Sequence, residues 1–337
     1  MIRTLALAVG VVVSATAQIP KIGAINFYGL RHQTEDRLLK TAGIAPGGPL
    51  AVSKGDVEEK LEQVSGIVAA RVEAVCCEGA DAIVFIGIEE RGAPHFDTRG
   101  APGGASTLPN DLTGDYREYL RAVQRAVQRE SGTEDYSRGE PHIADPAAQA
   151  FEERFRSFAA ENLELLRDVL RNTGDAEQRA IAASIIVYTP KKDAVLDDLQ
   201  YALQDADESV RANAVRSLKA VAVLAQKRPE LGLRVSPTWF VEMLNSLALS
   251  DRQQAAQALL ILTDSPGGTT LELVRERALG TLVEMARWKT LRYALPAFLL
   301  VGRLAGIADA DLQAQWQKGD RETAIKLALA PSPKQRK

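Results

Sequence analysis

The sequence is poor in the residue types that build catalytic and metal sites. Its 337 residues include only three histidines and two cysteines, and no serine lies within a Gly-x-Ser-x-Gly motif, the turn that carries the nucleophile of many hydrolases. His32, His95 and His142 lie far apart, and no two of them have the spacing of zinc ligands. We interpret all three as solvated loop histidines. The sequence therefore predicts no catalytic, metal-binding or cofactor-binding residues and no small-molecule substrate.

Two weaker patterns lead to the same interpretation. The segment Gly267–Thr270 precedes an expected helix, whose N-terminus can bind an anion, but it lacks the lysine of a phosphate-binding loop. We interpret it as a turn between helices. The acidic pairs Glu89–Glu90 and Asp197–Asp198 are adjacent in sequence, so their side chains diverge on a strand or a helix. We expect both pairs to be solvated.

The two cysteines, Cys76 and Cys77, are neighbours in an expected strand. Neighbouring strand residues point to opposite faces, and their Cα atoms lie ~3.8 Å apart, which is closer than most disulfides allow. We therefore expect one buried thiol and one exposed thiol. A strained disulfide between neighbours is the alternative.

A large charge of one sign is also absent. The formal net charge is -3 and the isoelectric point is about 5.8, so composition predicts no nucleic-acid partner. The basic tail, residues 331–337, is expected to be a solvated end. The alternative is a peripheral contact of this tail with acidic phospholipid on a membrane surface.

The N-terminus has the pattern of a secretory signal. Arg3 is followed by the apolar run Leu5–Val13 and by small residues at Ala15 and Ala17. This pattern predicts a signal peptide over residues 1–17, cleaved after Ala17, and export to the periplasm or cell envelope. An uncleaved N-terminal anchor is the alternative, although the run is shorter than the ~20 apolar residues of a membrane span.

Residues 22–91 predict a small α+β unit in the order β-α-α-β-β. Strand patterns cover Ile22 to Phe27, Ile67 to Val75 and Ala82 to Ile88, with a hairpin turn between the last two. Helical patterns begin near Thr34 and Ser53, which are expected caps, and Gly43 is expected to end the first helix. Helices on one face of the sheet would give a two-layer module. Its expected core residues are Ile22, Phe27, Val72, Val84 and Ile86.

Several of these residues occur in the order typical of a known module. They are Ile25, Phe27 and Gly29, then Leu38, Gly43, Pro49, Leu50, Leu61, Gly66 and Ile67, and finally the closing run Ile88–Arg91. In this order and spacing residues 22–91 resemble the POTRA domain of bacterial outer-membrane assembly, secretion and division proteins. The resemblance implies client peptides or a membrane-assembly machine as partners.

Residues 92–146 change in composition. The stretch from Gly92 to Gly114 is rich in glycine and proline, which predicts a flexible linker. Within residues 92–146 we expect one amphipathic helix over Asp115–Glu130, with Tyr119, Val123 and Val127 on one face.

Residues 147–330 are helical and repetitive throughout. We expect a long helix over 147–172, and N-caps at Asp175 and Asp251. Val210, Ala214 and Leu218 share one face of a further helix.

The segment 205–218 resembles a HEAT repeat. Asp205 and Arg211 carry the aspartate and arginine of that family, which the resemblance implies tie one repeat to the next. Arg179 lies 32 residues before Arg211, within the length of a helix pair, whereas the 251–264 copy has Ala255 in place of the arginine. Pro296 is expected to break or kink a later helix. We predict an all-α superhelix of about four HEAT-like helix pairs, with an irregular helical bundle as the alternative.

Together these units predict an exported, non-enzymatic scaffold of the cell envelope. Its partners would be proteins or peptides, bound through the helical-repeat surface and through strand edges of the α+β unit. One alternative is a structural component or assembly factor of an outer-membrane or cell-wall complex. Another is an enzyme whose site lies between repeats.

Overall fold

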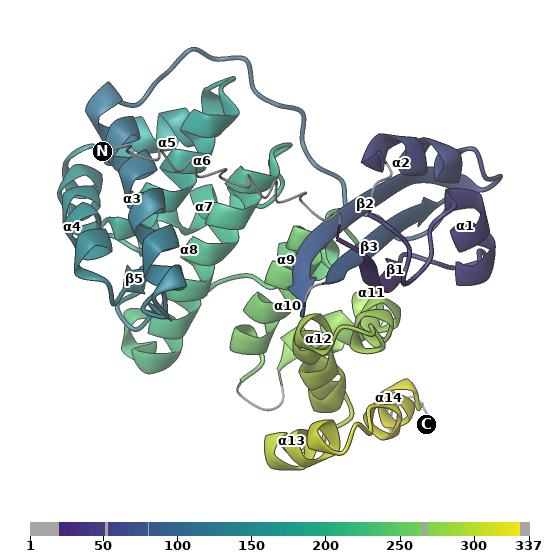
Figure 1. Cartoon of the computed structure of the whole chain (residues 1–337). Coiled ribbons are helices and arrows are strands. Elements are labelled where there is room, and N and C mark those ends of the chain that lie inside the picture. The colour runs from purple at the N-terminus through teal and green to yellow at the C-terminus, as the bar shows by residue number, and fades with distance from the viewer. Residues whose placement is uncertain (1–19, 51–52, 80, 265–267, 331–337) are drawn as a thin grey trace, which may run out of the picture.

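A computed structural model describes residues 20–50, 53–79, 81–264 and 268–330, which form a small mixed sheet followed by many helices (Figure 1). The expected succession of an α+β part and an all-α part is confirmed. The predicted signal peptide and the basic tail lie outside the described residues, as does Gly267. Within the described part of the chain no helix is both long and apolar enough to span a membrane.

The α+β part has the predicted element order. The elements are β1 Ile22–Tyr28, α1 Glu35–Ala42, α2 Lys54–Glu62, β2 Ile67–Glu78 and β3 Asp81–Glu90. The strand order is β1-β3-β2, with β1 parallel and β2 antiparallel to β3. Gly43 ends α1 with a left-handed φ of 69°, and the Ser53 side chain accepts a bond from the Asp56 N–H at the start of α2, as predicted. Thr34 precedes α1 but makes no capping bond with its side chain.

One face of this sheet packs on α1 and α2, and the five expected core residues are all buried there. The other face is buried as well, because Tyr28, Ile83 and Phe85 belong to the core of the helical part. Figure 1 shows the sheet between α1 and α2 on one side and α11 on the other. The unit therefore has helices on both faces, and the expected two-layer arrangement is wrong. The continuous apolar run from Ala82 to Ile88 is typical of a strand buried on both faces.

The segment between the two parts contains α3 Asn110–Gln128, β4 Glu134–Asp135 and β5 His142–Ile143. Its glycine-rich portion, expected to be a flexible linker, lies along the helices instead. Arg99 N donates to Gln204 O at 2.7 Å, and Gly104 N donates to Asn172 O at 2.8 Å. Any residue type can make such backbone bonds, so the sequence gives no sign of them. The prediction of a linker rested on the glycine and proline content alone.

Eleven further helices follow among the described residues. They are α4 Pro146–Glu161, α5 Leu163–Asn172, α6 Ala176–Ile185, α7 Leu196–Ala202, α8 Glu208–Lys227, α9 Thr238–Met243, α10 Leu249–Leu262, α11 Thr269–Ala286, α12 Leu291–Leu304, α13 Asp309–Gln317 and α14 Glu322–Leu329. Short 3-10 helices cover Ile186–Tyr188 (η1), Asp193–Val195 (η2) and Pro229–Leu231 (η3).

Two helix boundaries differ from the prediction. The long helix expected over 147–172 is interrupted at Asn162, whose φ of -122° and ψ of 34° are not helical. Conversely, the break expected at Pro296 does not occur, because α12 continues through this residue. The apolar periodicity marks both helices of 147–172 but carries no signal of the single residue between them.

The helices after α4 stack as pairs in two layers. In one layer α6, α8, α10, α12 and α14 contact one another in succession. In the other layer α5 contacts α7, and α9 contacts α11. Each helix of the first layer up to α12 also contacts the helix that precedes it in the chain. Because contacts run between neighbours, the described helices form an elongated stack of pairs, which we call the helix stack (residues 163–329).

Candidate functional site

Two buried arginine–aspartate pairs join successive helices of the stack. Arg179 on α6 donates to both carboxylate oxygens of Asp205 at 2.8 and 2.9 Å. Arg211 on α8 pairs with Asp251 on α10 at 2.8 Å, and it also donates to the carbonyl of Asp205 at 2.7 Å. All four side chains are at most 5% exposed. These pairs are structural ties, and they make Arg179 and Asp251 as important to the stack as Asp205 and Arg211.

The capping predictions for this region are half right. Asp175 caps α6 by accepting bonds from the N–H groups of Glu177 and Gln178, as expected. Asp251 does not cap a helix, because α10 begins two residues earlier at Leu249. Its carboxylate instead neutralises Arg211.

The sheet and the helix stack meet at a junction closed by buried hydrogen bonds. Asn26 donates to Thr290 Oγ1 at 3.1 Å, and its carbonyl oxygen accepts from Lys289 N at 2.6 Å. Trp288 Nε1 donates to the carbonyl of Phe27 at 3.0 Å. Tyr28 Oη donates to the carbonyl of Leu247 at 2.8 Å.

These bonds are surrounded by aromatic packing. The Phe85 ring lies 5.1 Å from that of Trp288 and 5.0 Å from that of Tyr293. Gly87 allows the Tyr28 ring to lie directly on β3, because a Cβ at that position would meet the ring at 2.4 Å. The junction is thus as closely packed as a domain core, and it occupies the carbonyl groups on the free edge of β1.

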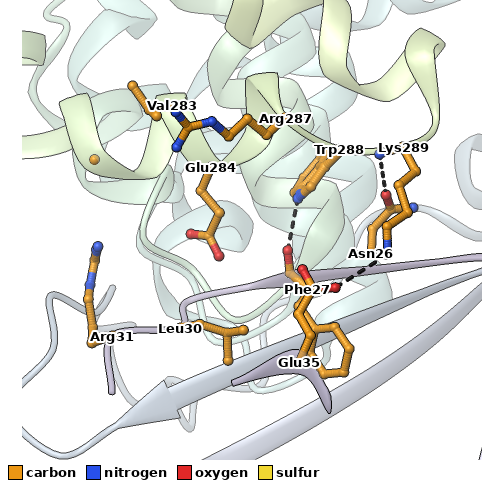
Figure 2. A pocket seen from close by; sticks show the side chains of 11 residues that line it. Asn26, Phe27, Leu30, Arg31, Glu35, Val283, Glu284, Arg287, Trp288 and Lys289 are labelled. Atoms are coloured by element: carbon orange, nitrogen blue, oxygen red, sulfur yellow. Dashed lines mark hydrogen bonds and ion pairs between the residues drawn. The ribbon is translucent and has the colours of Figure 1, made fainter. Parts of the chain in front are cut away.

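A cavity of about 330 Å³ opens beside this junction, between β1 and α11 (Figure 2). Figure 2 shows the carboxyl group of Glu284 extending from α11 into the space between Leu30 and Arg287, with Arg31 at the far side. Two of the cations at its rim are already paired, Arg287 with Glu322 and Lys289 with Glu35.

The junction contains two buried charged groups without close ion-pair partners. Burial raises the pKa of Glu284 above its ordinary value, although Arg252, Arg31 and the N–H groups of Gly29 and Leu30 act in the opposite direction. Burial lowers the pKa of Arg252, whose guanidinium lies 4.5 Å from the centre of the Tyr28 ring. Glu284 Oε2 and Arg252 Nη1 are buried and have no hydrogen-bond partner. Both groups are therefore more costly to bury than the paired arginines of the stack.

A larger cavity, of about 710 Å³, lies on the helical part between α4, η1 and the end of α8. We call it the stack groove. Glu140 is 8% exposed and accepts bonds from Arg156 Nε at 2.5 Å and from Lys192 Nζ at 2.6 Å. Burial lowers the pKa of Lys192, against the attraction of Glu140. Its apolar lining comes mainly from Tyr188, Pro190, Leu224, Leu231 and Leu233.

The outer edge of β2 is partly covered. Ala70 N donates to Glu62 Oε1 at 3.1 Å, and Val72 N donates to Glu58 Oε1 at 2.7 Å. Both glutamates belong to α2, which packs beside the strand. Two N–H groups that would pair with an added strand are thus already satisfied within the chain.

The histidines are placed differently from one another. His32 is 82% exposed and pairs with Glu90 at 2.9 Å, and His95 lies exposed beside Asp97. His142 belongs to β5, is 18% exposed and pairs with the fully buried Glu152 at 2.7 Å, so its interpretation as a solvated loop histidine is wrong. Among the residues that the structure describes, no group of His, Cys, Asp or Glu side chains could hold a metal ion.

Each acidic pair has one buried member, contrary to expectation. Asp198 accepts bonds from Arg167 and Arg171 and is buried between them. Glu90 is 3% exposed and accepts the N–H groups of Arg31, His32 and Gln33. Burial alone would raise the pKa of Glu90, but these hydrogen bonds lower it below its ordinary value. In each pair the two neighbouring side chains point in different directions, so one carboxylate is buried and hydrogen-bonded while the other is not buried.

Cys76 and Cys77 form a disulfide, so the expected pair of free thiols is wrong. The β2–β3 register shifts between Val75 and Glu78, and this irregularity replaces the regular alternation on which the expectation rested. Arg292 Nη2 donates to the carbonyl of Cys76 at 2.9 Å, which attaches this end of the hairpin to α12.

The sequence did not predict the residues of the junction or of the stack groove. Glu140, Lys192 and Leu231 come from three separate segments, and no spacing in the sequence connects them. Leu231 alone had a local signal, since it is an apolar residue in a turn between Pro229 and Gly232. No protein-family model matches the sequence, and no curated protein is significantly similar to it.

Proposed function

We propose that this protein is an exported scaffold of the cell envelope that binds protein or peptide partners through its helix stack. In this proposal the helix pairs are HEAT-like repeats and the α+β unit is a POTRA-like module. The stack groove is the observation that carries the proposal, because it combines apolar side chains with charged ones. Leu231 in its lining is 46% exposed, and the groove is open to a partner along one side of the stack.

The junction supports a scaffold in particular. The side chains of Asn26, Tyr28, Trp288 and Lys289 bond across it, and aromatic rings pack beside these bonds. A partner bound to the stack would therefore be held in a fixed orientation relative to the sheet. Partners that bind through a strand edge are less favoured, because Glu58 and Glu62 occupy the outer edge of β2.

Site-specific photo-crosslinking in the native host tests this function. A photoreactive residue at position 231 should give discrete crosslinked bands with one or a few envelope proteins. Position 120 on α3 is the matched control, because Leu120 is similarly exposed, at 49%, and lies away from the groove. Equal crosslinking from both positions, or none from position 231, would argue against a partner in the groove.

A further inference from the structure

The stack groove has an excess of buried positive charge. Two cations, Arg156 and Lys192, share the single carboxylate of Glu140, and their side chains are 22% and 10% exposed. Arg156 Nη2 is buried and has no hydrogen-bond partner. Glu153 pairs with Arg156 from the solvent side and is 70% exposed, so water screens its charge.

The rim of the groove adds two further cations. Arg228 is paired with Glu230, whereas the Arg138 side chain is exposed and makes no hydrogen bond or ion pair among the described residues. Asp193 is the acidic residue of the rim, and it is exposed. The inner groove is thus complementary to an anion, and Arg138 is free to contact the same anion from the rim.

Apolar side chains lie on the opposite side of the same cavity. Leu224 is at the end of α8, Leu231 in η3, and Leu233 just beyond it. Gly139, with a φ of 77°, packs against Leu224, which places Arg138 and Glu140 beside these leucines. The cavity therefore offers cationic and apolar side chains to the same bound group.

We propose that the stack groove binds the C-terminus of a partner polypeptide, with the terminal carboxylate on the Arg138, Arg156 and Lys192 side and an apolar last side chain on Leu224, Leu231 and Leu233. A C-terminal residue carries a carboxylate and an apolar side chain on the same Cα, so one residue supplies both groups that the lining of the cavity favours. Capture of a terminal carboxylate is a general mode of peptide recognition. This inference rests on the proposed function, since it specifies what part of a partner the groove recognises.

Fluorescence anisotropy with a synthetic peptide tests the inference on the full chain. The probe is fluorescein-labelled Gly-Ser-Gly-Ala-Ala-Leu with a free C-terminal carboxylate, compared with the same peptide ending in an amide. The free acid should bind at least ten-fold more tightly than the amide, and its affinity should fall as salt is raised. Equal binding of the two peptides, or no binding of either, overturns the inference.

Two variants with matched controls localise the binding. Arg138→Glu and Leu231→Asp should each weaken binding of the free-acid peptide at least ten-fold. Both side chains are exposed, so their replacement leaves the core intact. Arg125→Glu and Leu120→Asp make the same chemical changes on exposed positions of α3 and should leave the affinity within two-fold. An equal loss in the control variants shows that net charge drives the binding and overturns the inference.

The remaining outcomes separate this inference from the proposed function. If decanoate binds the groove and the peptide does not, the site recognises a lipid anion and the inference is wrong. If crosslinking at position 231 succeeds while the free-acid and amide peptides bind equally, the groove binds a partner but not its C-terminus. If crosslinking fails while the peptide binds as expected, the proposed scaffold function fails and a peptide site remains.

Discussion

The paired arginines of the helix stack and the arginine of the junction are equally buried but differ in their partners. Arg211 makes a bidentate pair with Asp251, whereas Arg252, the next residue after that aspartate, donates to the Ser246 carbonyl, lies over the Tyr28 ring and has no carboxylate within ion-pair distance among the described residues. A carboxylate within hydrogen-bond distance compensates a buried cation, and an aromatic face does so less well. We infer that the paired arginines stabilise the stack. The unpaired Arg252 is a less favourable burial, and it accompanies the packing of the sheet against the helices.

Replacement of each arginine by methionine makes this comparison directly. Arg211→Met leaves Asp251 buried without a counter-charge and should lower the free energy of unfolding by about 3–5 kcal/mol. Arg252→Met removes a cation that has no close counter-charge and should change it by less than about 1 kcal/mol. Urea denaturation of both variants measures the difference. Equal losses would mean that Arg252 and Glu284 act as a true ion pair.

The pH dependence of stability should depend on Glu284. Its pKa is raised in the folded protein, so its contribution to stability is fully present below its ordinary pKa and is lost as pH rises through the folded pKa. Glu284→Gln should therefore become progressively more stable relative to the wild type as pH rises from 4.5 to 8. Denaturation curves across this range measure the effect.

Glu276→Gln is the control for that measurement. Glu276 lies on the same helix as Glu284 but is exposed. Its replacement should leave the pH dependence of the wild type unchanged. The same pH dependence in the wild type and in Glu284→Gln would contradict a buried carboxyl with a raised pKa.

The smallest expected effect concerns the two edges of the sheet. The β1 edge is covered by side chains of the junction, whereas two N–H groups of the β2 edge are covered by the exposed helix α2, through Glu58 and Glu62. Glu58→Ala should cost about 0.5–1.5 kcal/mol, the value of one hydrogen bond, and should raise hydrogen exchange at the Val72 amide. Glu59→Ala, the same change at an exposed position of the same helix, leaves the bond to Val72 intact and is the control. Unchanged exchange at Val72 in Glu58→Ala would show that α2 does not protect this edge.

The features that were predicted correctly from the sequence are those determined by local interactions. Gly43, Ser53 and Asp175 act within a few residues of their own positions, so their roles at helix ends follow from residue type and spacing. The order β-α-α-β-β and the helical character of the remainder follow from periodicity in the same way. The predicted signal peptide stays a prediction, because it lies outside the described residues.

The junction was not predictable by such reasoning, because its partners are far apart in the chain. Asn26 and Thr290 are separated by 264 residues, and neither has a distinctive neighbourhood in the sequence. The apolar run of β3 is typical of a strand buried on both faces, but we expected helices on one face only, and the second face is covered by the helical part. The arginine–aspartate ties were predicted only in part, because the resemblance identified Asp205 and Arg211 but not the partner of either.

The central claim is that the sheet and the helix stack form one body, on which the proposed scaffold depends. A protease site inserted between Asp97 and Thr98, both exposed, allows the chain to be cut between the two parts. After cleavage without denaturant, size-exclusion chromatography at micromolar concentration should show both fragments eluting together, because the junction holds them. Asn26→Ala combined with Trp288→Ala should release the sheet fragment after the same cut. If the two fragments of the cut chain elute separately without these substitutions, the result contradicts the account and shows two independent modules.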